Sequence, residues 1–339
     1  MPVHIVVGGQ FGSEGKGKVA LHFAEQFNAH ISVKVSGINA GHTVIDSDGA
    51  NHIFRILPSC SVMGDVTCVL SAGCAFKPSL LFEEMEAMKG YNLKVLIDPL
   101  AGIITDEMAT SEKQSGLVER IGSTGTGTGE VTVRRLMCDG GFVGARDIPE
   151  LQPYICDTSE WMREQLTKGK DILIEGAQGY GLSVLGSYWP YCTSRATTAA
   201  AFLSEAGLSP FDVKNVIMTL RSYPIRVGGN SGPLPYETTW EQVTKDACSK
   251  TLIVEWTSVT RRKRRVARFD PELVRNAQRE NRANIVVLNF LDYIWDEEEG
   301  RIGPNRRQFL DMVRDKAECQ VTHVGFGPKS VLTLEEAGY

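Results

Sequence analysis

The chain has 339 residues, of which 42% are hydrophobic and 23% charged, an ordinary composition for a globular protein with a substantial core. The net charge of −5 argues against a nucleic-acid binder, and no apolar run approaches the roughly 18 residues of a membrane span. The 8 cysteines form no CxxC pair, which predicts reduced thiols in a cytoplasmic protein and argues against a cysteine metal site. The chain leads straight into an apolar run, so we expect no signal peptide.

Short apolar runs rich in β-forming residues alternate with helical patterns along the chain. Nearly continuous apolar runs are typical of parallel strands covered on both faces. The predicted strands cover residues 5–7, 31–35, 94–97, 172–175, 216–220 and 285–291. The alternation predicts a single α/β domain, residues 1–339, around a large, mostly parallel central sheet with helices on both faces and long active-site loops.

Two helical patterns carry clear end signals. The run 78–90 predicts a helix that Gly90 closes, because glycine readily ends helices. In the run 270–281, Asp270 is the expected N-cap and Pro271 the first helical residue.

The stretch GGQFGSEGKGK, residues 8–18, follows the first predicted strand and precedes a helix-like run. It looks like a phosphate-binding loop, yet it departs from the GxxxxGK[S/T] pattern because the residue after Lys16 is Gly17. A serine, Ser13, stands at its centre.

Two further glycine-rich segments favour ligand binding. IGSTGTGTG, residues 121–129, reads either as a flexible surface loop or as a second anion cradle of amides and hydroxyls. EGAQG, residues 175–179, follows a predicted strand directly, and such strand ends are where α/β folds bind ligands.

Taken together, the motifs resemble those of adenylosuccinate synthetases over nearly the whole chain. GQFGSEGKGK resembles the family's GQWGDEGKGK, NAGHT and EGAQG match as they stand, and ILPS also fits. IGSTGTGTG, WPYCTS, SVTRRKRR and GFGPK resemble TTGxGxGP, YPYVTS, TTGRRRR and STGP. The length resembles that of the short, archaeal-type members.

This resemblance implies a ligase. In the family, a nucleoside triphosphate phosphorylates O6 of a purine monophosphate, and the amine of L-aspartate then displaces the phosphate to give an N6-succinyl purine. Such a site must hold three anionic substrates and Mg²⁺ together, and glycine-rich cradles and arginines suit that task.

The resemblance also implies roles for individual residues. His42 would stabilise charge on O6 as an acid, Lys16 would neutralise the transferring phosphate, and Ser13 and Gln178 complete the implied catalytic set. Implied monophosphate-binding residues are Ser13, Asn39, Thr124, Arg134, Gln178, Thr193 and Val227. Implied triphosphate-binding residues are Gly12, Gly15, Lys16, Gly17, Lys18, Gly41, His42, Thr43, Asn289, Phe290, Asp292, Gly327 and Pro328. Implied aspartate-binding residues are Thr260, Arg262 and Arg264, and the implied Mg²⁺ ligands are Ser13 and the Gly41 carbonyl.

Two groups of arginines need a choice. Arg134 would reach the 5′-phosphate in the neighbouring subunit of a homodimer, with Arg135 as the competitor. RRKRR, residues 261–265, would ordinarily be a solvated face or a nucleic-acid patch. In the family the corresponding loop closes over aspartate, although Arg261 stands where a glycine is usual.

Ser13 departs from the family pattern, which has an aspartate that takes the N1 proton of hypoxanthine. A serine cannot replace that base, which is typically worth about 10²- to 10⁴-fold in rate. It does free space beside C2, where guanine carries an amino group that could donate a hydrogen bond to the serine oxygen. This resembles the phage 2-aminoadenylosuccinate synthases, which use dGMP and would work in the host cytoplasm. Glu14 or a water would then take the N1 proton.

Phe290 is the second departure, because the family has a lysine in its guanine-reading TKLD motif. An aromatic ring could stack on any base, which favours ATP or dATP as the donor, or it could simply belong to the core of the strand. The leading hypothesis is a ligase for dGMP, aspartate and ATP or dATP. The alternatives are a conventional synthetase for IMP and GTP, and an inactive nucleotide-binding protein with Ser13 as the lesion.

Overall fold

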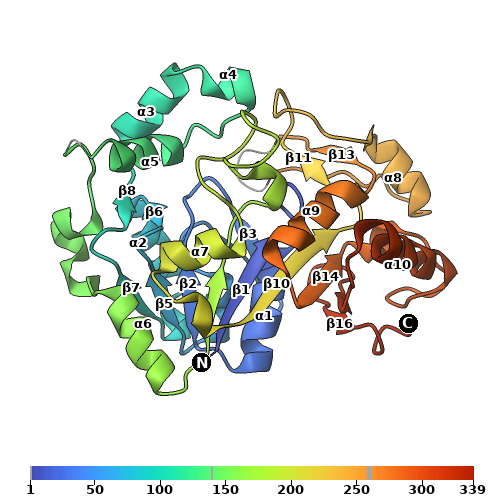
Figure 1. Cartoon of the computed structure of the whole chain (residues 1–339), viewed down its shortest axis with the longest axis horizontal. Coiled ribbons are helices and arrows are strands. Elements are labelled where there is room, and N and C mark those ends of the chain that lie inside the picture. The colour runs from blue at the N-terminus through green and yellow to red at the C-terminus, as the bar shows by residue number, and fades with distance from the viewer. Residues whose placement is uncertain (1, 139, 258–261) are drawn as a thin grey trace.

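The structure is a computed structural model that describes residues 2–138, 140–257 and 262–339 (Figure 1). Its centre is a nine-stranded sheet, parallel throughout except for the edge pair β15 and β16. In order across the sheet the strands are β16 (Leu332–Thr333), β15 (His323–Val324), β14 (Ile285–Asn289), β10 (Val213–Arg221), β1 (Val3–Gly8), β9 (Ile172–Glu175), β2 (Ile31–Lys34), β5 (Thr67–Leu70) and β7 (Lys94–Ile97). The chain therefore has the predicted α/β fold.

Among the described residues, three small sheets accompany the central one. They are the pair β3 (His42–Ile45) and β4 (Asn51–Phe54), the pair β6 (Ala75–Phe76) and β8 (Gly102–Ile103), and the set β11 (Ile225–Arg226), β13 (Arg265–Ala267) and β12 (Glu237–Thr238).

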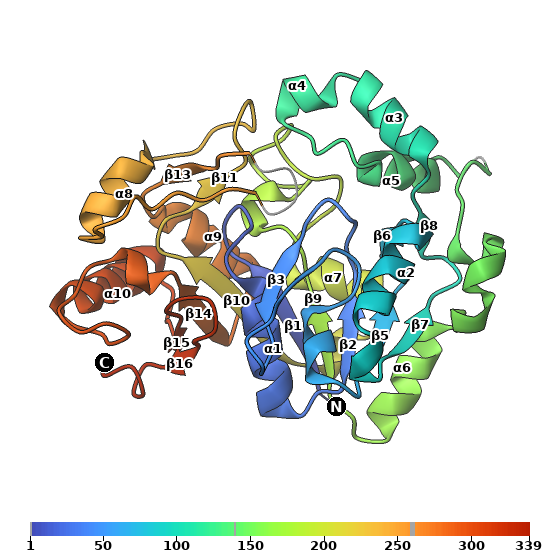
Figure 2. The same cartoon turned by 180° about the vertical axis from the view of Figure 1, so that it is seen from behind.

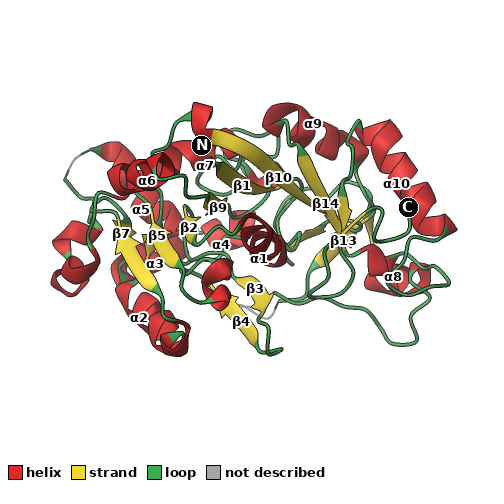
Figure 3. Cartoon of the chain, turned by 90° about the horizontal axis from the view of Figure 1, so that it is seen from below, coloured by secondary structure: helices red, strands yellow, loops and turns green. Residues whose placement is uncertain are grey.

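The helices cover both faces of the central sheet. Figure 3 shows α6, α7, α9 and α10 on one side and α1 on the other. The α-helices are α1 (Lys16–Phe27), α2 (Pro78–Ala87), α3 (Asp106–Gln114), α4 (Leu117–Ile121), α5 (Thr128–Met137), α6 (Thr158–Thr167), α7 (Ala199–Ala206), α8 (Trp240–Asp246), α9 (Pro271–Asn281) and α10 (Pro304–Ala317). The short 3₁₀ segments are η1 (Ser59–Met63), η2 (Lys89–Tyr91), η3 (Ala145–Asp147), η4 (Pro149–Tyr154), η5 (Tyr180–Leu182), η6 (Pro210–Asp212) and η7 (Leu291–Tyr293).

Burial on both faces explains the continuous apolar runs of the strands. Along β1, Val3, Ile5 and Val7 pack into a cluster with residues of α6, α7, α9 and α10. Val6 points the other way and packs against α1, which also contacts β9 and β3 (Figure 2). Successive strand residues face opposite sides, so a strand buried on both must be apolar at nearly every position.

Most predicted elements are confirmed, with two corrections. The strand predicted at 285–291 ends at Asn289, because Phe290 adopts a left-handed conformation with φ of 58° and turns the chain into η7. The helix predicted at 78–90 ends at Ala87, and Gly90 lies within η2 instead of closing the helix. The predicted Asp270 cap is present, and its carboxylate accepts hydrogen bonds from the amides of Glu272 and Leu273.

The parallel strands bring distant loops to one edge. The neighbouring strands β14, β10, β1, β9 and β2 end at this edge, and the loops that follow them carry the motifs. In Figure 1, α3 to α5 and the β11–β13 sheet lie beyond it, around the space into which these loops project. In the described part of the chain no helix is long and apolar enough to cross a membrane.

Candidate active site

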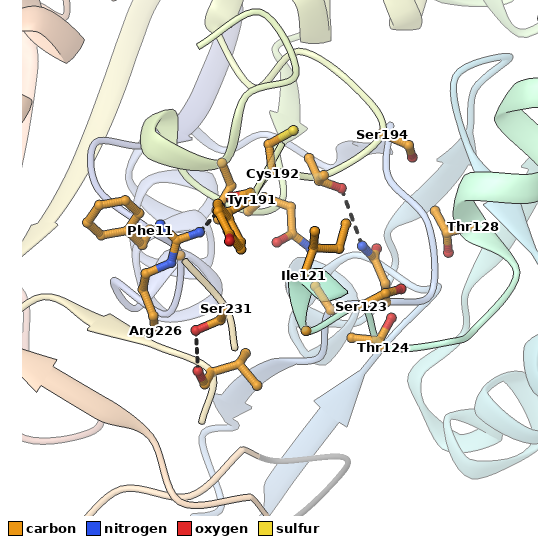
Figure 4. Close-up of a pocket in the computed structure, with 18 of the residues that line it drawn as sticks. Phe11, Ile121, Ser123, Thr124, Thr128, Tyr191, Cys192, Ser194, Arg226 and Ser231 are labelled. Carbon is orange, nitrogen blue, oxygen red and sulfur yellow. Dashed lines mark hydrogen bonds between the residues drawn. The ribbon is translucent and has the colours of Figure 1, made fainter. Parts of the chain in front are cut away.

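A cavity of about 400 Å³ lies at the carboxyl edge of the sheet, among the motif loops (Figure 4). Asn39 of the loop after β2 donates a hydrogen bond of 3.5 Å to the hydroxyl of Thr193, across the space between two separate motifs. The predicted residues that line this cavity are Gly12, Ser13, Asn39, Gly41, Thr124, Gln178, Thr193, Val227 and Arg264. The structure therefore assembles most of the predicted monophosphate set around one cavity.

The loop after β1 is organised by a buried carboxylate. Glu14 Oε1 accepts hydrogen bonds from the amides of Gln10, at 3.1 Å, and Gly12, at 2.7 Å. Its Oε2 accepts one from Lys16 Nζ at 2.6 Å. Glu14 thus holds the loop and Lys16, while Ser13 is exposed to the cavity in a left-handed conformation with φ of 57°.

His42 begins β3 and is buried against a carboxylate and an ammonium. Its Nδ1 is hydrogen bonded to Glu175 Oε1, and Lys34 Nζ lies 3.4 Å from both atoms. Ser59 holds both oxygens of the carboxylate, because its amide donates to Oε2 at 2.6 Å and its hydroxyl donates to Oε1 at 2.9 Å. This network orients the imidazole, and Glu175, the first residue of EGAQG, was not among the predicted site residues.

The glycine-rich segment 122–127 leads into the N-terminus of α5. Glu112 of α3 anchors it by accepting a hydrogen bond from Ser123 Oγ, at 2.5 Å, and from the Gly127 amide, at 2.6 Å. Thr124 remains exposed, and its hydroxyl lies 3.2 Å from that of Thr126. Amides at a helix N-terminus favour anions, so the anion-cradle interpretation fits this placement better than a flexible surface loop.

Gly12 and Gly41 of the predicted triphosphate set line the purine cavity, and further members of the set lie beside it, around the first turn of α1. Lys18 donates a hydrogen bond of 2.9 Å to the Gly327 carbonyl, and burial lowers the pKa of this lysine to about 8. The Gly327 amide donates to Asp292 Oδ1 at 3.3 Å. Pro328 and Lys18 line a second cavity of about 200 Å³.

Close backbone packing brings more of this set together. Gly15 has φ of 85°, which favours glycine, and a Cβ there would lie 2.9 Å from Asn289 Nδ2. A Cβ on Gly17 would lie 2.8 Å from the carbonyl oxygen of Thr43. The α1 N-terminus, β3 and the end of β14 thus meet at one place.

Phe290 lies outside the strand that was expected to contain it. Its ring stacks under the Arg221 guanidinium, 4.0 Å from the ring centroid, and contacts Tyr293 at 5.5 Å between rings. Its carbonyl accepts a hydrogen bond from Ser222 Oγ. The interpretation of Phe290 as a residue of the strand core is therefore wrong, whereas stacking on a donor base stays a prediction.

The arginine-rich segment forms the stem of a hairpin. The Thr257 amide donates to the Arg262 carbonyl, and the Arg264 amide to the Glu255 carbonyl, both at 2.9 Å. Arg264 lines the cavity, whereas Arg262 is exposed outside its wall. The third predicted aspartate ligand, Thr260, lies outside the described residues.

Arg134 and Arg135 differ in their surroundings on α5. Arg134 forms ion pairs with Glu130 and Glu107, at 3.2 and 3.3 Å. Arg135 donates to the carbonyls of Ala72 and Leu100 and stacks on Phe142. Because exposed ion pairs are weak, Arg134 can leave its partners more readily than Arg135 can leave two carbonyls.

Sequence reasoning missed Arg226, which forms part of the cavity wall. It donates hydrogen bonds to the carbonyls of Tyr191, at 2.6 Å, and Pro233, at 2.9 Å, and stacks on the ring of Phe11 (Figure 4). Burial lowers its pKa to about 10, so it remains charged at neutral pH. The resemblance pointed to its neighbour Val227 in the RVGG segment, and Arg226 itself was not among the predicted site residues.

The potential metal ligands at this site are neutral oxygen atoms. Within residues 2–138, 140–257 and 262–339 no group of three or more His, Cys, Asp or Glu side chains could hold a metal ion. Ser13, which carries a hydroxyl, and Gly41, which carries a backbone carbonyl, both line the cavity. This sparse donor set suits Mg²⁺, which keeps waters and binds largely through substrate phosphates.

Comparison with known proteins decides the family. The family model for adenylosuccinate synthetase matches residues 5–146 and 145–305. The chain belongs to the adenylosuccinate synthetase family. It is accordingly a nucleoside triphosphate-dependent ligase that forms a C–N bond.

Two archaeal adenylosuccinate synthetases are similar to this chain over nearly its whole length. It is 34% identical to the adenylosuccinate synthetase of Methanocaldococcus jannaschii over 340 residues, covering 98% of this chain and 96% of the relative. The Archaeoglobus fulgidus enzyme is also 34% identical, with 99% of each chain covered.

Two solved structures share the fold of the synthetase. Cyanophage S-2L succinoaminodeoxyadenylate synthetase (PurZ), bound to dGMP and dATP as an energy donor, has a TM-score of 0.84 and 28% identity over 98% of this chain and 95% of its own. Fully ligated adenylosuccinate synthetase from Plasmodium falciparum has a TM-score of 0.85 at 19% identity, over 98% of this chain and 100% of its own.

Proposed function

We propose that this synthetase joins L-aspartate to C6 of dGMP, through a 6-phosphoryl purine intermediate, to give 2-aminoadenylosuccinate in its deoxy form. The observation that carries the proposal is Ser13, an exposed residue in the wall of the cavity, at the position where the family motif has an aspartate. A serine oxygen can accept a hydrogen bond from the 2-amino group of guanine and leaves room for it. The cyanophage relative bound to dGMP supports this assignment.

The N1 proton of guanine needs an acceptor, and Glu14 is poorly placed to be one. Both of its carboxylate oxygens are committed to the Gln10 and Gly12 amides and to Lys16. Protonation of Glu14 would weaken the contacts that shape the loop. We therefore assign the N1 proton to a water held in the cavity beside Ser13.

His42 and Lys16 carry the charge that develops during phosphoryl transfer to O6. His42 would donate a hydrogen bond to O6 or to the transferring group, oriented by Glu175, and Lys16 would offset the phosphate charge. The donor's γ-phosphoryl group moves to O6, and the aspartate amine then displaces it as inorganic phosphate. Mg²⁺, when bound, would neutralise phosphate charge next to the Gly41 carbonyl and the Ser13 hydroxyl.

ATP or dATP is the proposed donor. Phe290 replaces a lysine of the family's guanine-reading motif and offers no hydrogen-bond donor to a base. Asp292 is retained, but its carboxylate already accepts the Gly327 amide. The dATP bound by the cyanophage relative supports an adenine donor.

The proposed assembly is a homodimer of one catalytic domain, residues 1–339. Val133, Leu136 and Met137 share one face of α5 and are 53%, 74% and 64% exposed, which favours a protein contact at that face. Arg134 lies next to this face on α5 and would reach the 5′-phosphate of the neighbouring subunit.

The second candidate function is conventional adenylosuccinate synthesis from IMP, aspartate and GTP. The names of the archaeal relatives favour it. The intact arrangement of His42, Lys16 and Gln178 argues against an inactive protein.

The deciding experiment measures kcat/KM for dGMP, GMP and IMP, each with ATP, dATP and GTP, in the wild type and in Ser13→Asp. We expect the wild type to prefer dGMP with an adenine donor. Ser13→Asp should crowd the 2-amino group and restore a base suited to hypoxanthine, so the dGMP to IMP ratio should fall by at least about tenfold. That fall is a small part of the roughly 10⁴- to 10⁵-fold that polar recognition can reach.

Ser13→Ala is the matched control, because it removes the acceptor without refilling the space. It should weaken dGMP use without improving IMP use. A wild type that prefers IMP, or a ratio that Ser13→Asp leaves unchanged, would overturn the assignment of Ser13 as the purine selector.

A further inference from the structure

A compact charged cluster lies at the base of the arginine hairpin, beside the purine cavity. Glu255 Oε2 accepts hydrogen bonds from Arg264 Nη1, at 2.7 Å, and from Arg221 Nη1, at 3.2 Å. Its Oε1 accepts from Arg221 Nη2 and from the Tyr293 hydroxyl, the latter at 3.0 Å. One carboxylate thus receives four hydrogen bonds from three side chains.

The cluster carries more positive than negative charge. It holds two guanidinium groups against the single carboxylate of Glu255, and the Arg221 side chain is fully buried. The Nε atoms of Arg221 and Arg264 are buried without a hydrogen-bond partner among the described residues. The excess positive charge and the position of Arg264 in the cavity wall are the complement of one more carboxylate.

Arg221 connects this cluster to the purine and donor loops. Its Nη1 donates to the Ser13 carbonyl at 3.0 Å, and its guanidinium covers the Phe290 ring. Gln10 fixes its backbone, since the Arg221 amide donates to Gln10 Oε1 at 2.9 Å and Gln10 Nε2 donates to the Arg221 carbonyl at 3.1 Å. Arg221 is therefore held in place by contacts other than those with Glu255, which is why a change at Glu255 should act mainly through Arg264.

Glu255 is held ionised in this setting. Burial alone would raise its pKa, but Arg221 and Arg264 outweigh burial and lower the pKa to about 2. The carboxylate therefore stays charged at neutral pH and keeps its hydrogen bond with Arg264 Nη1. The backbone bond between the Arg264 amide and the Glu255 carbonyl keeps the pair opposite each other.

We propose that Glu255 is a positioning residue for aspartate: it holds the Arg264 guanidinium at the cavity wall so that the remaining donors of that arginine meet a carboxylate of the substrate. The assignment rests on the proposed function only in taking aspartate as that substrate. Glu255 touches no reacting atom and acts through Arg264.

The test replaces Glu255 by glutamine and measures KM separately for each substrate. Glu255→Gln should raise KM for aspartate by about tenfold or more, the equivalent of one charge-assisted hydrogen bond, with KM for both nucleotides changed less than about threefold. Glu255→Asp keeps the charge but cannot span both arginines, so it should give an intermediate KM for aspartate. It is also the variant to use if Glu255→Gln does not fold.

Glu237→Gln is the matched control. Glu237 forms an ion pair of 2.6 Å with Arg265, the residue that follows Arg264, and Glu237 does not line the cavity. The same chemical change there should leave KM for aspartate within about twofold of the wild type, as expected for an exposed ion pair.

Three outcomes would overturn the inference. The first is an unchanged KM for aspartate in both Glu255 variants. The second is a parallel loss in all three KM values with a lowered Tm, which would indicate a structural role. The third is an equal effect of Glu237→Gln. Aspartate is common to dGMP and IMP chemistry, so a wild type that prefers IMP would refute the dGMP assignment and leave this test intact. If the wild type consumes no aspartate with either dGMP or IMP, both the proposed function and this inference are refuted.

Discussion

His42 has to gain a proton before it can act as an acid. Burial, and next the Lys34 ammonium, lower the pKa of His42 to about 4, against the opposing attraction of Glu175. Burial would raise the pKa of Glu175, but Lys34 and His42 outweigh it and hold that pKa well below its usual range. At neutral pH the imidazole is therefore neutral. With its Nδ1–H assigned as the donor to Glu175, its Nε2 has no proton to give.

Triphosphate binding supplies the missing charge. Phosphate oxygens beside His42 would raise its pKa, and a group whose pKa rises past the ambient pH takes up a proton. We predict an uptake of up to about one proton per site when ATP binds at about pH 8, where the γ-phosphate is already ionised. Calorimetry in buffers of different ionisation enthalpy measures it. His42→Asn should lose this uptake, and the same uptake in both proteins would show that the proton goes elsewhere.

At the scale of elements, the link between α3 and the glycine-rich segment 122–127 should control monophosphate binding. Glu112 holds that segment through Ser123 Oγ and the Gly127 amide, just before the N-terminus of α5. Glu112→Ala removes both anchors, so we predict that KM for the monophosphate rises by about tenfold, with a smaller change in KM for aspartate. Steady-state kinetics with each substrate varied in turn provides the measurement.

An exposed glutamate on the neighbouring helix provides the control for Glu112. Glu119 lies on α4, is exposed and does not line the cavity, so Glu119→Gln should leave all three KM values unchanged. If Glu112→Ala changes the KM for the monophosphate no more than Glu119→Gln does, the glycine-rich segment 122–127 does not depend on Glu112 for binding.

The elements were predictable where local chemistry decides them. The apolar runs at 94–97 and 172–175 gave the strand bounds without error, and the Asp270–Pro271 pair fixed the start of α9. Phe290 was misplaced because an aromatic residue after an apolar run has high strand propensity, whereas tertiary contacts with Arg221 and Ser222 hold it in the turn.

The candidate site was predictable only in part, and the whole molecule explains why. Motif residues such as Ser13 and Gln178 follow strands that are neighbours in the sheet, so their convergence follows from parallel pairing. Arg221, Glu255 and Glu112 belong to none of the recognised motifs; Arg221 acts through contacts with Gln10 and Ser13, far away in the sequence, and Glu255 and Glu112 act through contacts between neighbouring loops and helices. Their roles follow from three-dimensional packing, which a single sequence does not encode in any local pattern.

The last prediction concerns assembly. If Arg134 completes the phosphate site of a neighbouring subunit, each active site needs His42 from one chain and Arg134 from the other. An Arg134→Leu protein and a His42→Ala protein should each be nearly inactive. Random exchange makes half of the dimers hybrids with one intact site each, so an equal mixture should recover up to about a quarter of the wild-type activity.

A mixture of Lys16→Ala with His42→Ala separates complementation from a trivial gain on mixing. Lys16 and His42 belong to the same subunit's site, so no hybrid of these two variants contains an intact one, and its activity should stay at the level of the separate proteins. Subunit exchange is verified by native mass spectrometry with one isotope-labelled partner. Proven exchange without recovery in the Arg134→Leu mixture would mean that Arg134 serves its own chain, where Glu107 and Glu130 already hold it.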